Sequence, residues 1–241
     1  MTITVVEVPS ERPGIRRTAR VAGAAIPAGA RVEVLRFLAV YAYSSIGNDP
    51  VSRRSRRLCT AIKAADSGAL TSCARTIAAL IRARTDFAAV LDRHAVLVPV
   101  PASAPRAAFA TDVSLEIARA LAQAGIGAGV RDVLVRAEAV RKSATAPVGA
   151  RPSVAMHFSS FETLATPVEA STTALVLVDD VVSRGRTLLA AACRLRERYP
   201  QIPILALALM RTLGYATCLA ALTAPCVGEI RWRHGDAVRR P

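Results

Sequence analysis

The fold is decided by one stretch of the chain: Ala174-Leu175-Val176-Leu177-Val178-Asp179-Asp180-Val181-Val182-Ser183-Arg184-Gly185-Arg186-Thr187. The five apolar residues before Asp179 are too few to span a membrane and are typical of a parallel strand buried on both faces. Asp179 and Asp180 therefore mark the carboxyl end of this strand, and the loop around Gly185 leads into a helix. In open α/β sheets, ligands bind at this edge, where the first N–H groups of the next helix lack partners.

The residues at this edge predict a ligand with hydroxyls at one end and a phosphate at the other. Gly185 lets the backbone approach a ligand closely, and Ser183 and Thr187 supply hydroxyl donors. The positive end of the helix points at the same place and suits a phosphate. Asp179 and Asp180 would repel a phosphate and match neutral hydroxyls, so the stretch favours a ribose 5-phosphate unit.

Two arginines, Arg184 and Arg186, stand at the start of the predicted helix. The helix dipole disfavours a cation there by about 0.3 to 1 kcal/mol, and a bound anion would compensate. The alternative interpretation is an ordinary strand-to-helix turn capped by acids. That alternative does not require Ser, Gly and Thr together.

The stretch resembles the ribosyl-diphosphate (PRPP) binding motif of the type I phosphoribosyltransferase family, a hydrophobic strand followed by Asp-Asp and Ser/Thr-x-Gly-x-Thr. The resemblance implies that Asp179 and Asp180 hold the ribose 2- and 3-hydroxyls and take part in catalysis. It implies a 5-phosphate site built from Val181, Ser183, Arg184, Gly185, Arg186 and Thr187. It further implies an α/β fold with a mainly parallel sheet flanked by helices around a Rossmann-like core, and Mg²⁺ held by PRPP and water.

The family builds its pyrophosphate site from the loop after the first core strand, which here is residues 101–106. The resemblance assigns Ala102, Ser103 and Arg106 to pyrophosphate, through backbone N–H groups, a hydroxyl and a charge. The alternative is a proline-capped turn with an exposed arginine.

The basic segment between Arg136 and Phe161 resembles the mobile hood loop of the family, which closes over the sugar. We expect Lys142 and Arg151 to be its catalytic contacts to pyrophosphate. A solvated basic loop is the alternative. His157 is expected to be an interior histidine rather than a catalytic base.

Within the family, the chain is similar to the competence protein ComF-like branch. The similarity rests on an Ile62-Lys63 pair in a helical N-terminal lobe and on the Val-Pro-Val-Pro run at residues 98–101, and it spans roughly residues 41–211. The chain differs from this branch at Ala107-Ala108-Phe109-Ala110, where Arg-Gly-Phe-Asn is expected, and near the N-terminus, where it has no cysteine pairs for a zinc ribbon.

Turn signals and hydrophobic periods predict three parts. Residues 1–30 are expected to form a loosely ordered extension or one short strand near residues 3–8. Residues 31–93 are expected to form a helical lobe of roughly three helices, and residues 94–241 the phosphoribosyltransferase-like α/β domain. The predicted elements of the last part are strands near residues 95–103, 130–135, 174–178, 204–210 and 226–232, and a helix over residues 108–124.

Composition indicates a cytoplasmic protein with no membrane segment. The five cysteines form no Cys-x-x-Cys pair, and no apolar run approaches 18 residues. The net charge of +14 favours anionic partners; the alternative is that part of this excess reflects a GC-rich coding background. The densest basic cluster, residues 52–57, suits nucleic acid, a solvated helix face or a phosphorylatable turn.

These observations predict a glycosyltransferase of nucleotide metabolism. It would take PRPP with Mg²⁺, transfer the phosphoribosyl group to an unidentified nitrogenous acceptor and release pyrophosphate. The alternative is a non-catalytic regulator that binds PRPP or a nucleotide, or a nucleic-acid-associated module. The sequence argues against a P-loop nucleotidase, because the chain has no Gly-x-x-x-x-Gly-Lys-Ser/Thr run. Homodimer formation is left open.

Overall fold

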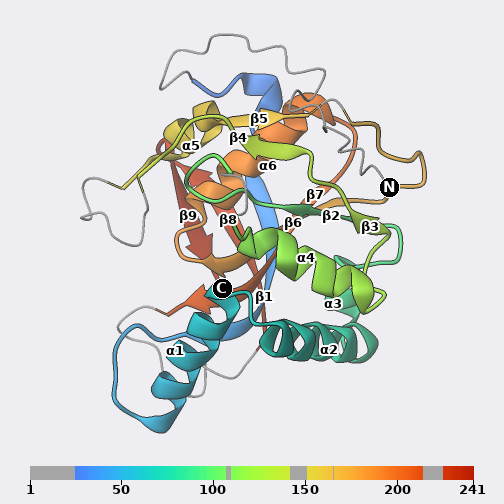
Figure 1. The fold of residues 1–241 in the computed structure, drawn as a ribbon. Coiled ribbons are helices and arrows are strands. Elements are labelled where there is room, and N and C mark those ends of the chain that lie inside the picture. Colours follow the sequence, from blue (N-terminus) through green and yellow to red (C-terminus); the bar gives the residue numbers. More distant parts are fainter. Residues whose placement is uncertain (1–24, 107–109, 142–150, 165, 214–224) are drawn as a thin grey trace, which may run out of the picture.

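The computed structural model describes residues 25–106, 110–141, 151–164, 166–213 and 225–241. In this part of the chain, seven strands form one sheet in the order β3-β2-β6-β7-β1-β8-β9, and β4 and β5 form a second, two-stranded sheet (Figure 1). The strands are β1 (Val34–Tyr43), β2 (Val96–Pro99), β3 (Gly129–Val130), β4 (Leu134–Arg136), β5 (Phe161–Thr163), β6 (Leu175–Val182), β7 (Ile204–Thr212), β8 (Cys226–Arg233) and β9 (Asp236–Arg240). The helices are η1 (Ala28–Ala30), α1 (Pro50–Lys63), α2 (Ser67–Ala83), α3 (Thr85–Ala88), α4 (Val113–Gln123), α5 (Val154–Ser160) and α6 (Arg186–Arg198).

The first five strands in the sheet order, β3, β2, β6, β7 and β1, are parallel to one another. The last two, β8 and β9, are added by antiparallel pairing. Val178 of β6 pairs with Pro99 of β2 on one side and with Leu207 of β7 on the other. The carboxyl ends of these three strands therefore meet at one edge. The predicted α/β class, with a mostly parallel sheet flanked by helices, is confirmed.

Helices cover both faces of the large sheet. One apolar cluster joins α5 and α6 to the face that carries Leu177, and a second joins α1, α2 and α4 to the face that carries Val176 and Val178. All three side chains are fully buried, which confirms that the apolar run is a strand buried on both faces. Among the helices of the described residues, none is long and apolar enough to cross a membrane.

The prediction of a helical lobe over residues 31–93 is wrong at its start, because β1 occupies Val34–Tyr43. β1 lies inside the sheet, where it pairs with β7 on one side and with β8 on the other. From Phe37 onward it is buried on both faces and its sequence is an unbroken apolar run, which is compatible with a buried helix as well as with a strand.

Most other predicted elements are confirmed: β2, β6, α6, β7 and β8 lie where the sequence places them. The strand predicted over residues 130–135 is instead split between β3, at the edge of the large sheet, and β4, which pairs with β5. The helix expected from residue 108 begins at Val113 after the N-cap Asp112, whose side chain accepts from the N–H of Leu115. The strand predicted near residues 3–8 lies outside the described residues.

Candidate functional site

β6 carries Asp179 and Asp180 near its carboxyl end, and both residues are half-buried. The N–H of Asp180 donates to Oδ1 of Asp179 at 2.9 Å, and the N–H of Val181 donates to Oδ1 of Asp180 at 2.6 Å. Burial, followed by the negative charge of Asp180, raises the pKa of Asp179 above its usual range. Two acids this close together favour a neutral or cationic partner over an anionic one.

Lys63 brings a positive charge to these acids from a distant part of the chain. It ends α1, and its Nζ donates to Oδ2 of Asp180 at 2.6 Å. Burial lowers the pKa of Lys63, but the charge and hydrogen bond of Asp180 outweigh it and leave the pKa raised. We did not predict this contact from the sequence; the signal for it was the Ile62-Lys63 pair.

The loop between β6 and α6 turns at Gly185, which adopts a φ of +86° in the left-handed region. A Cβ at this position would lie 2.6 Å from Cδ1 of Ile230 in β8, so both the backbone and the packing require glycine. Gly185 supplies no capping side chain, which leaves the first N–H groups of α6 to a ligand or to water. Ser183 and Arg184 are exposed beside this helix terminus, and Thr187 is half-buried in its first turn.

Arg186, which we expected to contact phosphate, is held by two other segments. Its Nε donates to Oδ1 of Asp236 in β9 at 2.6 Å, and its Nη2 pairs with the other oxygen of the same carboxylate. Its Nη1 donates to the carbonyls of Arg151 at 3.4 Å and Pro152 at 3.3 Å. In this structure the guanidinium therefore joins the loop to β9 and to the segment before α5.

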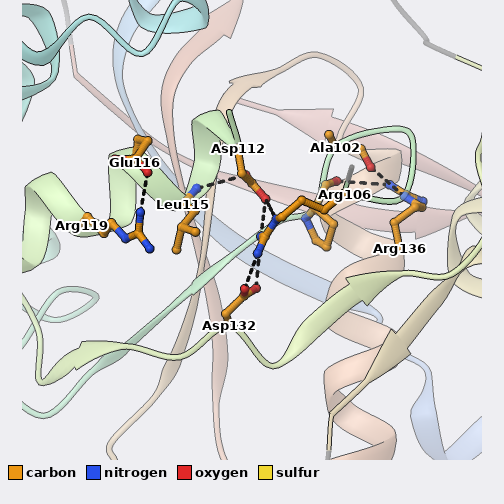
Figure 2. Close-up of polar contacts among 9 residues, drawn as sticks. Ala102, Arg106, Asp112, Leu115, Glu116, Arg119, Asp132 and Arg136 are labelled. Carbon is orange, nitrogen blue, oxygen red and sulfur yellow. Dashed lines mark hydrogen bonds and ion pairs between the residues drawn. The ribbon is translucent and has the colours of Figure 1, made fainter. Parts of the chain in front are cut away.

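The loop after β2 is hydrogen-bonded to Arg136, which lies at the end of β4 (Figure 2). Nε of Arg136 donates to the carbonyl of Ala102 at 2.8 Å, and its Nη2 donates to the carbonyl of Pro101 at 3.4 Å. The described peptide bonds are all trans, so the C=O and N–H of each peptide point in opposite directions. The N–H groups of Ala102 and Ser103 therefore point away from Arg136.

Arg136 is also the centre of a buried polar network. Its side chain is 5% exposed, its Nη1 donates to Oγ of Ser160 at 2.6 Å, and Nδ1 of His157 lies 3.5 Å from the same nitrogen. The guanidinium stacks over the ring of Phe161 at 3.8 Å. Burial lowers the pKa of Arg136 to about 10, and the negative charge of Asp179 opposes this shift. We did not predict this residue to be part of the site.

Arg106, predicted to bind pyrophosphate, lies between two carboxylates in Figure 2. Its Nη2 is 2.5 Å from Oδ2 of Asp112, and its Nη1 is 2.6 Å from Oδ2 of Asp132. These pairs tie the loop after β2 to the start of α4 and to the segment between β3 and β4. A cavity of about 420 Å³ opens beside them, lined by Ala64, Ala65, Arg106, Ala110, Thr111, Asp112, Leu115, Glu116 and Arg119.

The remaining predicted residues are divided between the site and its surroundings. Ser103 is half-buried, and its carbonyl accepts from the N–H of Val140 at 2.7 Å. Arg151 is half-buried in the segment before α5, where its carbonyl meets Arg186. Lys142 lies outside the described residues. The acids, the loop of residues 183–187 and the loop after β2 therefore share one edge of the sheet, and Lys63 and Arg136 join them there.

His157 lies inside the network as an interior residue. It is 3% exposed, and its Nε2 lies 3.5 Å from Oγ1 of Thr187. Burial, followed by the positive charges of Arg136 and Arg186, lowers its pKa to about 4. The imidazole is therefore neutral near pH 7.

This burial predicts a loss of stability in acid. The folded pKa of about 4 lies below the usual histidine value, so the native state binds fewer protons than the unfolded state. The stabilisation is complete above about pH 6.5 and is lost as the pH falls toward 4, by up to about 3 kcal/mol. Urea unfolding between pH 7 and 4 should show a smaller loss in His157→Gln than in the parent or in His94→Gln. Equal losses in all three proteins would contradict the assignment.

Comparison of the sequence with models of known protein families gave no match, and no curated protein matched it either. The geometry around Asp179 and Gly185 is therefore the basis for assigning a function.

Proposed function

We propose that the protein is a phosphoribosyltransferase of type I, which binds PRPP and transfers its phosphoribosyl group to a nitrogenous acceptor. The observation that carries the proposal is the position of Asp179 and Asp180, directly ahead of the Gly185 turn and the uncapped start of α6. A carboxylate pair suits two ribose hydroxyls, and a helix N-terminus at a parallel sheet edge suits the 5-phosphate. Lys63 limits the repulsion between the acids and the phosphates of the ligand.

In the proposed reaction, the bond between C1 and the pyrophosphate oxygen breaks and a bond from the acceptor nitrogen to C1 forms. Pyrophosphate leaves with the electron pair, and the acceptor loses a proton to solvent. The N–H groups of Ala102 and Ser103, directed away from Arg136, are the donors we assign to the departing pyrophosphate. The carboxylates fix the ribose so that the acceptor meets C1 in line.

The acids also fit the Mg²⁺ that accompanies PRPP. Carboxylate oxygens are the hard ligands that Mg²⁺ prefers, and Asp179 and Asp180 offer them at the ribose end of the proposed site. When bound through PRPP, the ion would supply positive charge to the leaving pyrophosphate. The side chains of the protein hold the hydroxyls and exclude water.

Calorimetric titration with PRPP and Mg²⁺ tests the proposal. The double variant Asp179→Asn/Asp180→Asn should bind PRPP about 100-fold more weakly or worse, because two hydrogen bonds to charged acceptors are weakened. Glu138→Gln/Glu169→Gln is the matched control, since it removes the same charge from two exposed sites. An unchanged isotherm in the double variant, or an absence of PRPP binding to the parent, would refute the proposal.

Pyrophosphate release separates the enzyme from the non-catalytic alternative. Protein that binds PRPP is incubated with a panel of nitrogenous bases and with ammonia, and released pyrophosphate is measured against the double variant. Release that needs both the acceptor and the two acids supports transfer. Saturable PRPP binding without release from any acceptor would favour a regulator that binds PRPP.

A basic helix face favours nucleic-acid binding as a second candidate function. Arg53, Arg54 and Arg57 are exposed on α1, while Ser52 and Ser55 face inward. Exposed cations on one helix can follow a phosphate backbone, and such binding weakens steeply as salt rises. Titration with duplex DNA at two salt concentrations, for the parent and for Arg53→Gln/Arg57→Gln, tests this function separately from PRPP binding.

A further inference from the structure

Two arginines lie together beyond the residues assigned to PRPP. Arg211 is near the carboxyl end of β7, where it pairs with Val182, the residue before the Gly185 loop. Arg239 lies on β9, and its Nη2 donates to the carbonyl of Thr212 at 2.5 Å. This contact brings Arg239 from the edge strand of the sheet to the end of β7.

The guanidinium of Arg239 is only partly satisfied. Its Nη1 is buried and has no hydrogen-bond acceptor among the residues that the structure describes. Arg211 is 8% exposed and stands close enough to act on Arg239 by its charge. Burial, followed by the positive charge of Arg211, lowers the pKa of Arg239.

The Nη1 of Arg239 is unfavourably placed without an acceptor. A buried guanidinium nitrogen that makes no hydrogen bond carries the full cost of leaving water, and a second cation nearby adds repulsion. A carboxylate or phosphate group accepts hydrogen bonds from several N–H donors, and its negative charge offsets the repulsion between the two arginines. The position at the carboxyl edge of β7 is where open α/β sheets bind ligands.

We propose that Arg211 and Arg239 bind an oxyanion, a carboxylate or phosphate group, carried by the acceptor of the phosphoribosyl group. This inference rests on the proposed function, because it names the class of acceptor, a nitrogen base with a negative substituent. The same two arginines would also bind free inorganic phosphate. Experiments with both kinds of probe distinguish these two sources.

The first experiment titrates the full chain with inorganic phosphate. The parent should bind at two sites, one at the Gly185 loop and one at Arg239. Arg239→Gln should weaken the second site about tenfold or more, because it removes hydrogen bonds to a charged group. Arg240→Gln, which removes one charge from the exposed neighbour on β9, should leave both sites. Thr187→Ala should affect only the loop site.

The second experiment adds nicotinate or nicotinamide to PRPP-saturated protein, a pair that differs in one carboxylate. The parent should bind nicotinate more tightly, and Arg239→Gln should lose this preference. Equal binding of the two probes by the parent would overturn the acceptor assignment in favour of free phosphate. Unchanged phosphate binding in Arg239→Gln would overturn the site itself.

Two further arms keep the outcome readable. Urea unfolding checks that Arg239→Gln is folded. If it is not, Arg239→Lys takes its place. This variant keeps the charge but loses the second nitrogen, and it should also weaken phosphate binding at the second site. If the parent does not bind PRPP, but Arg239→Gln binds one phosphate fewer than the parent, the proposed function fails and the oxyanion site stands.

Discussion

Replacing Arg136 with methionine is expected to lower the free energy of unfolding by about 3 kcal/mol or more. The substitution leaves the carbonyl of Ala102 without the donor it has in the folded protein and removes the hydrogen bond to Oγ of Ser160. It also removes the stacking of the guanidinium on Phe161. Urea unfolding at pH 7 measures the loss.

Two comparisons make this result specific. Arg141→Met removes an exposed arginine from the same segment and is expected to change stability by less than about 0.5 kcal/mol. Arg136→Lys keeps a positive charge but cannot reach both the carbonyls and Ser160, and it should lie between the parent and Arg136→Met. An Arg136→Met variant as stable as Arg141→Met would show that the network contributes little.

Gly185→Ala is expected to cost about 2 to 4 kcal/mol and to weaken PRPP binding by about tenfold or more. The new Cβ meets three carbon atoms of Ile230, at 2.6, 2.7 and 2.8 Å, and the positive φ is strained for any residue with a Cβ. Because Ile230 is fully buried, the loop has to move away from β8. Urea unfolding and PRPP calorimetry measure the two effects.

Gly125 offers a matched control for this substitution. It has a φ of +75°, and a Cβ there would meet nothing within 4 Å, so Gly125→Ala carries the backbone strain alone. The difference between the two alanine variants isolates the clash with Ile230. Shortening this side chain, in Gly185→Ala/Ile230→Ala, should recover part of the lost PRPP affinity. Equal costs at both glycines, with no such recovery, would contradict the role given to β8.

The part of the site that the sequence predicted is its local part. Asp179, Asp180 and Gly185 follow one another along a strand, a turn and a helix, so hydrophobic period and turn chemistry are enough to place them. The carboxyl ends of β2 and β6 could also be predicted to meet, because short apolar strands alternating with helices form parallel sheets.

The contacts that hold the site together could not be predicted in the same way. Lys63 meets Asp180, and Arg186 meets Asp236, across long separations in the chain, and no local period records such pairs. β1 was missed because its longer part, from Phe37 onward, is buried on both faces and has no alternation to distinguish it from a buried helix. In the sequence, Arg136 and Arg106 are both basic residues near the loop after β2. Their different roles are visible only from their partners, the carbonyl of Ala102 for Arg136 and the carboxylate of Asp112 for Arg106.

The position of β1 also determines the order in which the protein can be assembled. Its two neighbours in the sheet, β7 and β8, are synthesised long after it, so β1 waits without strand partners while most of the chain emerges from the ribosome. Closing such distant pairs is slow, because the entropy of a long loop is lost before the pairing stabilises it. We therefore expect the centre of the sheet to form late in folding, and an apolar strand exposed until then is a natural client for a chaperone.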